Sequence, residues 1–167
     1  IRTEEKDMGS FEEGFRLMEE KFGNGRDNLI ALATIAREHC DGGKVCPAVR
    51  TVDAYYEDGC FYSVVNAKSN KILQIAQNDE VAVSAYEEMF TAAGKGENLG
   101  WALDPKNAEL RTKLRSVFAD WYDMANNEQD ENCVYMAIHL TRGILNINHW
   151  EKLYHMDFEK RTEMQEM

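Results

Sequence analysis

The chain has 167 residues, of which 44% are hydrophobic and 29% charged, and its formal net charge is -11 at pH 7. This length suits one domain with a sizeable core, and the composition is typical of a globular protein. The acidic balance argues against nucleic acid as a partner, because like charges repel. No window is apolar enough to span a membrane, and the start lacks the apolar segment of a secretory leader, so a cytoplasmic protein is expected.

The four cysteines, at positions 40, 46, 60 and 133, form no C-x-x-C pair. Cys46, Cys60 and Cys133 fall in strand-like runs and are expected to be small buried side chains, as in a reducing cytoplasm. His39 and Cys40 with Cys46 lack a matching second pair of ligands, so the sequence predicts no metal site.

The first half of the chain predicts one helix followed by three strands. Ser10 and Glu13 have the spacing of a capping box, and the helix that they open ends at Gly23. The strand-like runs are residues 29–36, 45–56 and 60–65. The glycine-containing turn at residues 57–59 predicts a tight hairpin, which makes the last two of these strands antiparallel.

The second half predicts a short helix at residues 69–77, then strands at 80–86 and 90–98 and a long final strand at 133–148, bent at Arg142 and Gly143. Gly94 and Gly96 indicate a bulge or a close backbone approach. Asp104 followed by Pro105 predicts the start of one long helix, whose apolar stripe runs to Met124. Residues 151–167 are expected to form a helix or a loose arm.

This order of elements predicts a mainly β protein. About six strands are joined by hairpins or short links, and few helices separate them. Local connections of this kind favour a barrel or closed sheet with helices packed outside. We expect a single domain over residues 1–167, with its core at about 17–150 and a C-terminal arm at 151–167.

The turn at residues 66–71 is the most informative segment for function. It joins an apolar strand to a helix start, where unpaired N–H groups and the helix dipole favour a phosphate. Ser69 and Lys71 fit a phosphate site, but a serine that only caps the helix and a solvated lysine fit equally well. Arg50, in the middle of a predicted strand, favours the phosphate site, because arginine can hold a phosphate through two parallel hydrogen bonds.

Around these residues the chain resembles the FMN-binding split-barrel proteins, the relatives of pyridoxamine 5'-phosphate oxidase. The similar runs are residues 47–52, 58–62, 66–71, 74–83 and 90–97, and the resemblance as a whole covers about residues 17–150. It implies a six-stranded antiparallel Greek-key split barrel with flanking helices. It also implies a homodimer with FMN bound in the clefts between the subunits.

The resemblance implies a set of FMN-binding residues: Arg50, Thr51, Val52, Val64, Val65, Asn66, Ser69, Asn70, Lys71 and Trp150. Arg50, Ser69 and Lys71 match the phosphate site. Thr51 and Val52 place backbone along the isoalloxazine ring, and Val64 to Asn66 line its other side. Trp150 aligns with a tryptophan that borders the flavin from the partner subunit.

Two departures from the oxidase are visible. Asn70 stands where the oxidase has an arginine, so one positive charge is missing from the phosphate site. The oxidase's substrate signature is also absent after Trp150. Pyridoxamine phosphate is therefore not the expected substrate.

The resemblance implies an FMN-dependent oxidoreductase that takes electrons from a reduced nicotinamide or another small organic donor. Because the flavin carries out the chemistry, the protein needs no conventional acid or base, and the sequence shows no convincing catalytic pair. The alternative is a non-catalytic or stress-related protein of the same fold that binds a flavin, haem or a deazaflavin.

Overall fold

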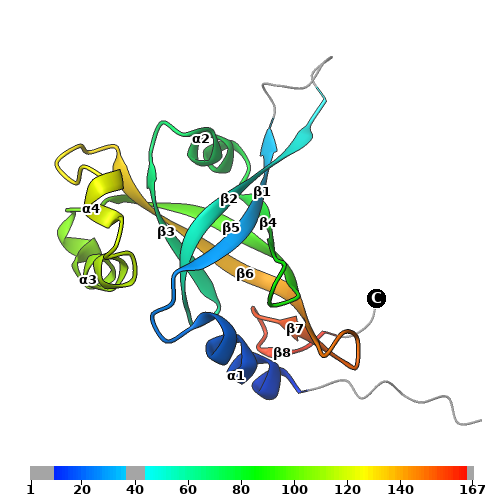
Figure 1. The fold of residues 1–167 in the computed structure, drawn as a ribbon. Helices are drawn as coiled ribbons and strands as arrows, with labels where there is room; N and C mark the ends of the chain where they lie inside the picture. The colour runs from blue at the N-terminus through cyan, green and yellow to red at the C-terminus, as the bar shows by residue number, and fades with distance from the viewer. Residues whose placement is uncertain (1–9, 37–43, 165–167) are drawn as a thin grey trace, which may run out of the picture.

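The computed structural model describes residues 10–36 and 44–164 (Figure 1). Six strands close an antiparallel barrel in the order β3-β2-β1-β4-β5-β6, and β3 pairs back onto β6. They are β1 Asn28–Ala36, β2 Cys46–Glu57, β3 Cys60–Asn66, β4 Glu80–Ala85, β5 Phe90–Trp101 and β6 Cys133–Ile147. The predicted β-barrel with flanking helices is thus confirmed.

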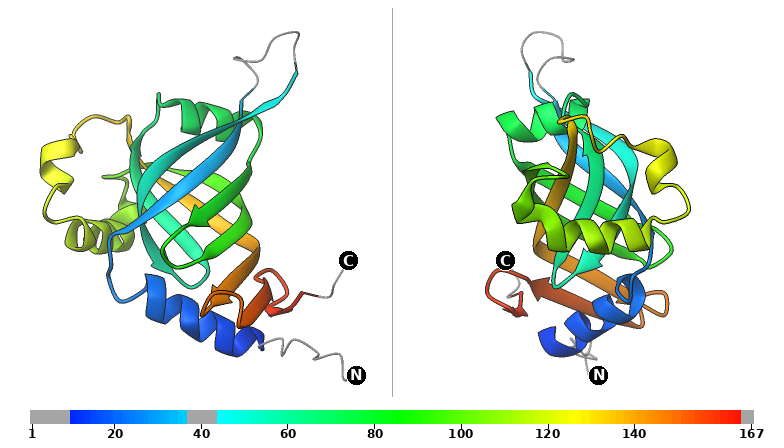
Figure 2. Two further views of the ribbon diagram at one scale, coloured as in Figure 1. Left: turned by 45° about the vertical axis from the view of Figure 1, so that its right-hand side comes forward. Right: turned by 90° about the vertical axis from the view of Figure 1, so that its left-hand side faces the viewer.

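Helices cover the ends and one side of this barrel (Figures 1 and 2). They are α1 Phe11–Phe22, α2 Asn70–Gln77, the 3-10 helix η2 Pro105–Asn107, α3 Ala108–Val117 and α4 Tyr122–Ala125. Helix α2 lies at one end of the barrel and α1 at the other, while α3 and α4 lie on the side near β3. No described helix is long and apolar enough to cross a membrane.

Helix α1 forms where its cap and its apolar stripe predict it. The Ser10 hydroxyl accepts a hydrogen bond from the Glu13 N–H at 3.2 Å, which satisfies one of the free donors of the first turn. Met18 and Phe22 are fully buried, and the Phe22 ring meets the Phe61 ring edge to face at 5.4 Å. This packing joins α1 to the barrel core.

Strand β5 shows the close backbone approach that its glycines predict. A Cβ atom on Gly94 would lie 2.8 Å from the backbone oxygen of His139 on β6. The pairing of β5 with β6 also shifts register between Ala93 and Gly94. A side chain at position 94 would therefore push the two strands apart, and the bulge sits directly beside the bend predicted near Arg142.

The prediction of a single long helix after Pro105 is wrong. Helix α3 ends at Val117, and a turn separates it from α4. In this turn Phe118 is fully buried, and its ring lies 4.7 Å from that of Trp121. Burial of Phe118 beside Leu114 in a second small core explains why the apolar stripe does not continue as one straight helix.

The tail, expected as a helix or loose arm, instead adds strands to the sheet. Strand β7 Lys152–Asp157 pairs antiparallel with the end of β6, and β8 Thr162–Glu163 pairs with β7. Tyr154 and Met156 are buried against the core, and β7 contacts α1. Burial of alternate residues against α1 is what selects a strand here.

The cysteines only partly follow expectation. Cys60 and Cys133 are buried and have free thiols, as predicted. Cys46, at the start of β2, is half-buried and disulfide-bonded, so the expectation of a small buried thiol is wrong for this residue. His39 and Cys40 lie outside the described residues.

Candidate functional site

The barrel wall is split between β2 and β3. These strands pair only at Tyr55↔Tyr62, Tyr56↔Phe61 and Glu57↔Cys60, next to their hairpin turn. Beyond this point β2 remains paired with β1 and β3 with β6, so the two strands diverge. The Ser63 hydroxyl donates a hydrogen bond to the backbone oxygen of Asp53 at 2.6 Å, and bridges the strands where they begin to separate.

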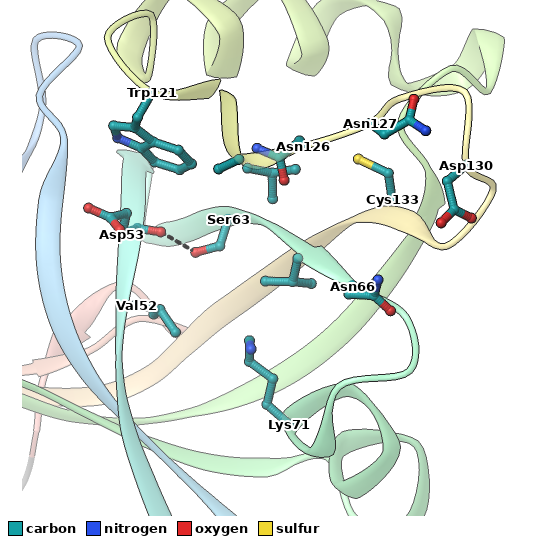
Figure 3. Close-up of a pocket in the computed structure, with 13 residues that line it drawn as sticks. Val52, Asp53, Ser63, Asn66, Lys71, Trp121, Asn126, Asn127, Asp130 and Cys133 are labelled. Carbon is teal, nitrogen blue, oxygen red and sulfur yellow. Dashed lines mark hydrogen bonds between the residues drawn. The ribbon is translucent and has the colours of Figure 1, made fainter. Parts of the chain in front are cut away.

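A cavity of about 430 Å³ opens in this split (Figure 3). Its volume lies within the range of small-molecule sites. One wall comes from β2 and β3, the second from α4 and the loop that follows it, and Lys71 reaches in from α2. The lining residues are Val52, Asp53, Ser63, Val64, Val65, Asn66, Lys71, Trp121, Ala125, Asn126, Asn127, Asp130 and Cys133.

The fold brings half of the sequence-predicted site residues to this cavity: Val52, Val64, Val65, Asn66 and Lys71. Arg50 and Ser69 lie close by at the α2 end of the barrel, whereas Thr51 and Asn70 are exposed and do not line the cavity. Trp150 is 65% exposed in the turn between β6 and β7 and does not line the cavity of its own chain. The cofactor-binding roles of all these residues stay predictions.

Sequence reasoning missed the second wall. Trp121 falls within the apolar stripe of the predicted long helix, which indicates a packing residue, and the polar residues of the α4 loop carry no recognisable motif. They reach the cavity only because the chain between β5 and β6 folds back over β3. Asp53 did give a signal, since it is a charged residue in a strand directly after Val52.

Arg50 is held at the barrel end by three uncharged acceptors. Its Nη1 donates to the Thr34 hydroxyl at 2.6 Å and to the Leu32 backbone oxygen at 3.3 Å, and its Nη2 donates to the Gln74 amide oxygen at 2.9 Å. No described carboxylate forms an ion pair with this guanidinium. Its positive charge is therefore not compensated by these neighbours.

Lys71 is a second half-buried cation at the same place. Burial lowers the pKa of its ammonium group, and the positive charge of Arg50 lowers that pKa further. Within residues 10–36 and 44–164, Lys71 has no ion-pair partner. Two neighbouring cations in a partly buried position repel each other, and an anion bound between them would offset that cost.

Ser69 adds a buried donor at the start of α2. It occupies the N-cap position, but its side chain makes no capping hydrogen bond. Its hydroxyl oxygen is buried and has no hydrogen-bond partner among the described residues. The interpretation that Ser69 merely caps a helix is therefore not supported, because a buried hydroxyl without a partner is costly and needs another explanation.

The carboxyl group of Asp27 fastens the second wall to the barrel. The Trp121 indole N–H donates to an Asp27 carboxylate oxygen at 2.9 Å. Burial, a hydrogen bond with Asp27 and the negative charge of that neighbour together raise the pKa of Asp53 to about 6. Asp27 thus holds Trp121 at the cavity and lies beside Asp53, which lines it.

Glu128 fixes the loop after α4. Its carboxylate accepts two hydrogen bonds from Arg111, at 2.9 and 2.7 Å, and one from the Tyr122 hydroxyl at 2.9 Å. The guanidinium of Arg111 is the main reason why the pKa of Glu128 falls to about 2. The Tyr122 hydroxyl also lies 2.7 Å from that of Tyr135 on β6. These bonds hold the loop that forms the second wall.

No family model matches the chain, and no curated protein sequence matches it. Solved structures do match. An FAD-binding protein from Mesorhizobium loti is 18% identical, with a TM-score of 0.54 over 76% of this chain and 90% of that one. A protein from Clostridium acetobutylicum, related to general stress protein 26 and of the pyridoxine phosphate oxidase family, is 12% identical, with a TM-score of 0.56 over 90% and 96%.

A haem-binding protein from Mycobacterium smegmatis is 14% identical, with a TM-score of 0.59 over 86% of this chain and 58% of that one. At these identities the matches establish the fold. Together with the closed six-stranded barrel and its split between β2 and β3, they show that this chain has the split-barrel fold of flavin-binding and pyridoxine phosphate oxidase-like proteins.

Proposed function

We propose that the protein binds FMN in the split between β2 and β3, with the phosphate at Arg50, Ser69 and Lys71. One observation carries this proposal. Two half-buried cations and one buried hydroxyl lie near the start of α2, and the described residues supply neither an acid for the cations nor a hydrogen-bond partner for the hydroxyl. A phosphate supplies the missing negative charge and accepts hydrogen bonds from all three groups. The phosphate of FMN therefore fits the residues at this position.

The rest of the cavity suits the flavin ring. Val52, Val64 and Val65 present apolar surface, while the diverging edges of β2 and β3 offer backbone polar groups. Figure 3 shows Trp121 and Lys71 at opposite ends of the cavity. Apolar walls with a few fixed polar groups are typical of cofactor sites.

We further propose an FMN-dependent oxidoreductase with a small-molecule or nicotinamide electron donor, acting as a cytoplasmic homodimer. Bound FMN would supply hydride or electron transfer, and the residues of the chain would bind and orient it and exclude water. If FMN-loaded protein oxidises no donor from a broad panel of reduced nicotinamides and small organic molecules in steady-state assays, the alternative of a non-catalytic flavin-binding protein is correct.

The cavity favours a flavin over haem. Its described lining contains no histidine or tyrosine, and the one thiol, Cys133, has its pKa raised by burial, which disfavours an iron-bound thiolate. The absorbance spectrum of the purified protein separates these cofactors. A Soret band, or colourless protein that fails to take up added FMN, would contradict the proposal.

Removal of either positively charged side chain, Arg50 or Lys71, tests the proposed phosphate site directly. We expect Arg50→Ala and Lys71→Ala each to weaken FMN binding by about 1.5–3 kcal/mol, the range for a hydrogen bond to a charged group. Riboflavin, which lacks the phosphate, should bind these variants as it binds the wild type. Fluorescence titration of apo-protein with both flavins measures the difference.

Lys68 supplies a matched control, since it is an exposed lysine on the same turn. Lys68→Ala should leave both affinities unchanged. If Arg50→Ala and Lys71→Ala lose FMN and riboflavin equally, these side chains do not hold the phosphate, and the assignment is wrong.

A further inference from the structure

We propose that Gln74 and Thr34 are positioning residues, which orient Arg50 for the phosphate while leaving its positive charge available; this inference rests on the proposed FMN site. Gln74 lies on the inner face of α2 and is 2% exposed, and Thr34 lies on β1 and is 1% exposed. Buried polar side chains need hydrogen-bond partners, and both find them in the same network.

The network has a defined direction. The Thr34 hydroxyl donates to the Gln74 amide oxygen at 2.6 Å, and the same amide oxygen accepts from Arg50 Nη2 at 2.9 Å. Arg50 Nη1 donates to the Thr34 oxygen at 2.6 Å. Each side chain therefore fixes the other two, and the Gln74 amide must direct its oxygen, rather than its nitrogen, toward the guanidinium.

This network occupies only part of the guanidinium. Arginine has about five N–H donors, and the bonds to Leu32, Thr34 and Gln74 use both hydrogens on Nη1 and one on Nη2. The hydrogens on Nε and the second on Nη2 make no hydrogen bond to the described residues. They lie on one edge of the planar group, which is the edge that binds two oxygens of a phosphate.

The acceptors are also chemically matched to this role. A glutamate at position 74 would fill the same space and hold the same guanidinium more strongly. It would also neutralise Arg50, and the two cations would no longer attract an anion. The Gln74 amide and the Thr34 hydroxyl orient the guanidinium without neutralising it. The uncharged side chain at position 74 therefore makes the site prefer a phosphorylated ligand over one without a phosphate.

Gln74→Glu separates positioning from a merely structural role, because it keeps the size and the acceptor. We expect FMN to bind the variant at least about tenfold more weakly, as when a hydrogen bond between charged groups is lost. Riboflavin should bind within about twofold of the wild type, and the apo-protein should melt at no lower temperature. Fluorescence titration with both flavins and thermal unfolding of the apo-protein measure these effects.

Two further variants complete the experiment. Gln77→Glu places the same charge on an exposed position of α2 and should leave the ratio of FMN to riboflavin affinity unchanged. Thr34→Val removes the hydroxyl at nearly constant volume and should weaken FMN selectively, while Thr34→Ser should restore it. These two variants at Thr34 keep the test decisive if Gln74→Glu does not fold.

The outcomes distinguish this inference from the proposed function. If the wild type binds FMN more tightly than riboflavin and Gln74→Glu keeps the same preference, the positioning role is wrong while the FMN site stands. If the wild type binds neither flavin, or binds both equally, the phosphate site itself is wrong and this inference falls with it.

Discussion

At the scale of single residues, groups of like charge lie next to each other around the split, and their repulsion lowers the stability of the folded protein. Arg50 and Lys71 are neighbouring cations, and burial lowers the pKa of each. Asp53 and Asp27 are neighbouring acids, and the pKa of Asp53 is raised to about 6. Repelling groups of this kind cluster where a protein binds ligands, because the ligand supplies what the fold leaves uncompensated.

Asp53 gives the chain a pH-dependent stability. Its pKa is higher in the folded protein than the ordinary 3.8, so the folded state favours its protonated form. The stability that protonated Asp53 contributes to the folded state is fully present below about pH 4, and it is lost as the pH rises through about 6. Asp53→Asn should therefore stabilise the protein at pH 7.5 by about 1 kcal/mol, after allowance for solvent screening, and have little effect at pH 4.

Urea unfolding of Asp53→Asn at both pH values measures this difference. Asp120→Asn is a suitable control, since Asp120 is exposed and should change stability at neither pH. An equal effect of Asp53→Asn at pH 4 and pH 7.5 would show that the carboxyl group does not titrate between them.

At the scale of elements, the site depends on where strands stop pairing. The hairpin turn at residues 57–59 joins β2 and β3 as their sequence predicts, and Asp58 and Gly59 take the positive φ angles that tight turns require. The early separation of the two strands was not predictable from local sequence. Both continue as ordinary strands, and only their other neighbours, β1 and β6, draw them apart.

A second prediction at this scale concerns Gly94 on β5. Gly94→Ala places a Cβ atom 2.8 Å from the His139 backbone oxygen, so β5 and β6 must shift apart. We expect a loss of about 1–3 kcal/mol in the free energy of unfolding, the usual cost of overpacking. The urea midpoint measures it, and Glu131→Ala, at an exposed loop position outside both the cavity and the groove, serves as the control. Unchanged stability would show that the strands relax without cost.

At the scale of the whole molecule, β1 is apolar on both faces. Its inward residues form part of the core, but Leu29, Ala31 and Ala33 point outward, and Leu29 is 66% exposed. Val49 on β2 is 70% exposed, and with Ala31 and Ala33 it lines a broad groove of about 1530 Å³ that reaches the β7–β8 edge. Strands that are apolar on both faces are normally covered on both, which fits a second copy of the chain.

We therefore expect a homodimer in solution by light scattering. Ala33→Glu should give a monomer, because an uncompensated charge at a buried contact strongly disfavours association. Tyr86→Glu is the control, since Tyr86 is 92% exposed and does not line the groove. A wild-type monomer would contradict the predicted dimer, and with it the prediction that Trp150 borders the flavin of the other subunit.

The sequence by itself determined most of the helices and strands of the barrel, and it predicted residues that the fold brings together. The cap at Ser10, the hairpin turn and the alternation in β4 are local signals, and each depends on neighbouring residues. The resemblance to the split-barrel proteins grouped Val52, Val64, Val65, Asn66 and Lys71 as site residues, and the fold places them around one cavity.

Only the tertiary structure decided how the site is completed. The wall formed by Trp121 and the α4 loop comes from a distant part of the chain, and its position depends on bonds such as that from Trp121 to Asp27. The uncharged partners of Arg50 likewise come from β1 and α2, which meet only in the closed barrel. Long-range contacts of this kind leave no local periodicity, so no pattern along the chain could have predicted them.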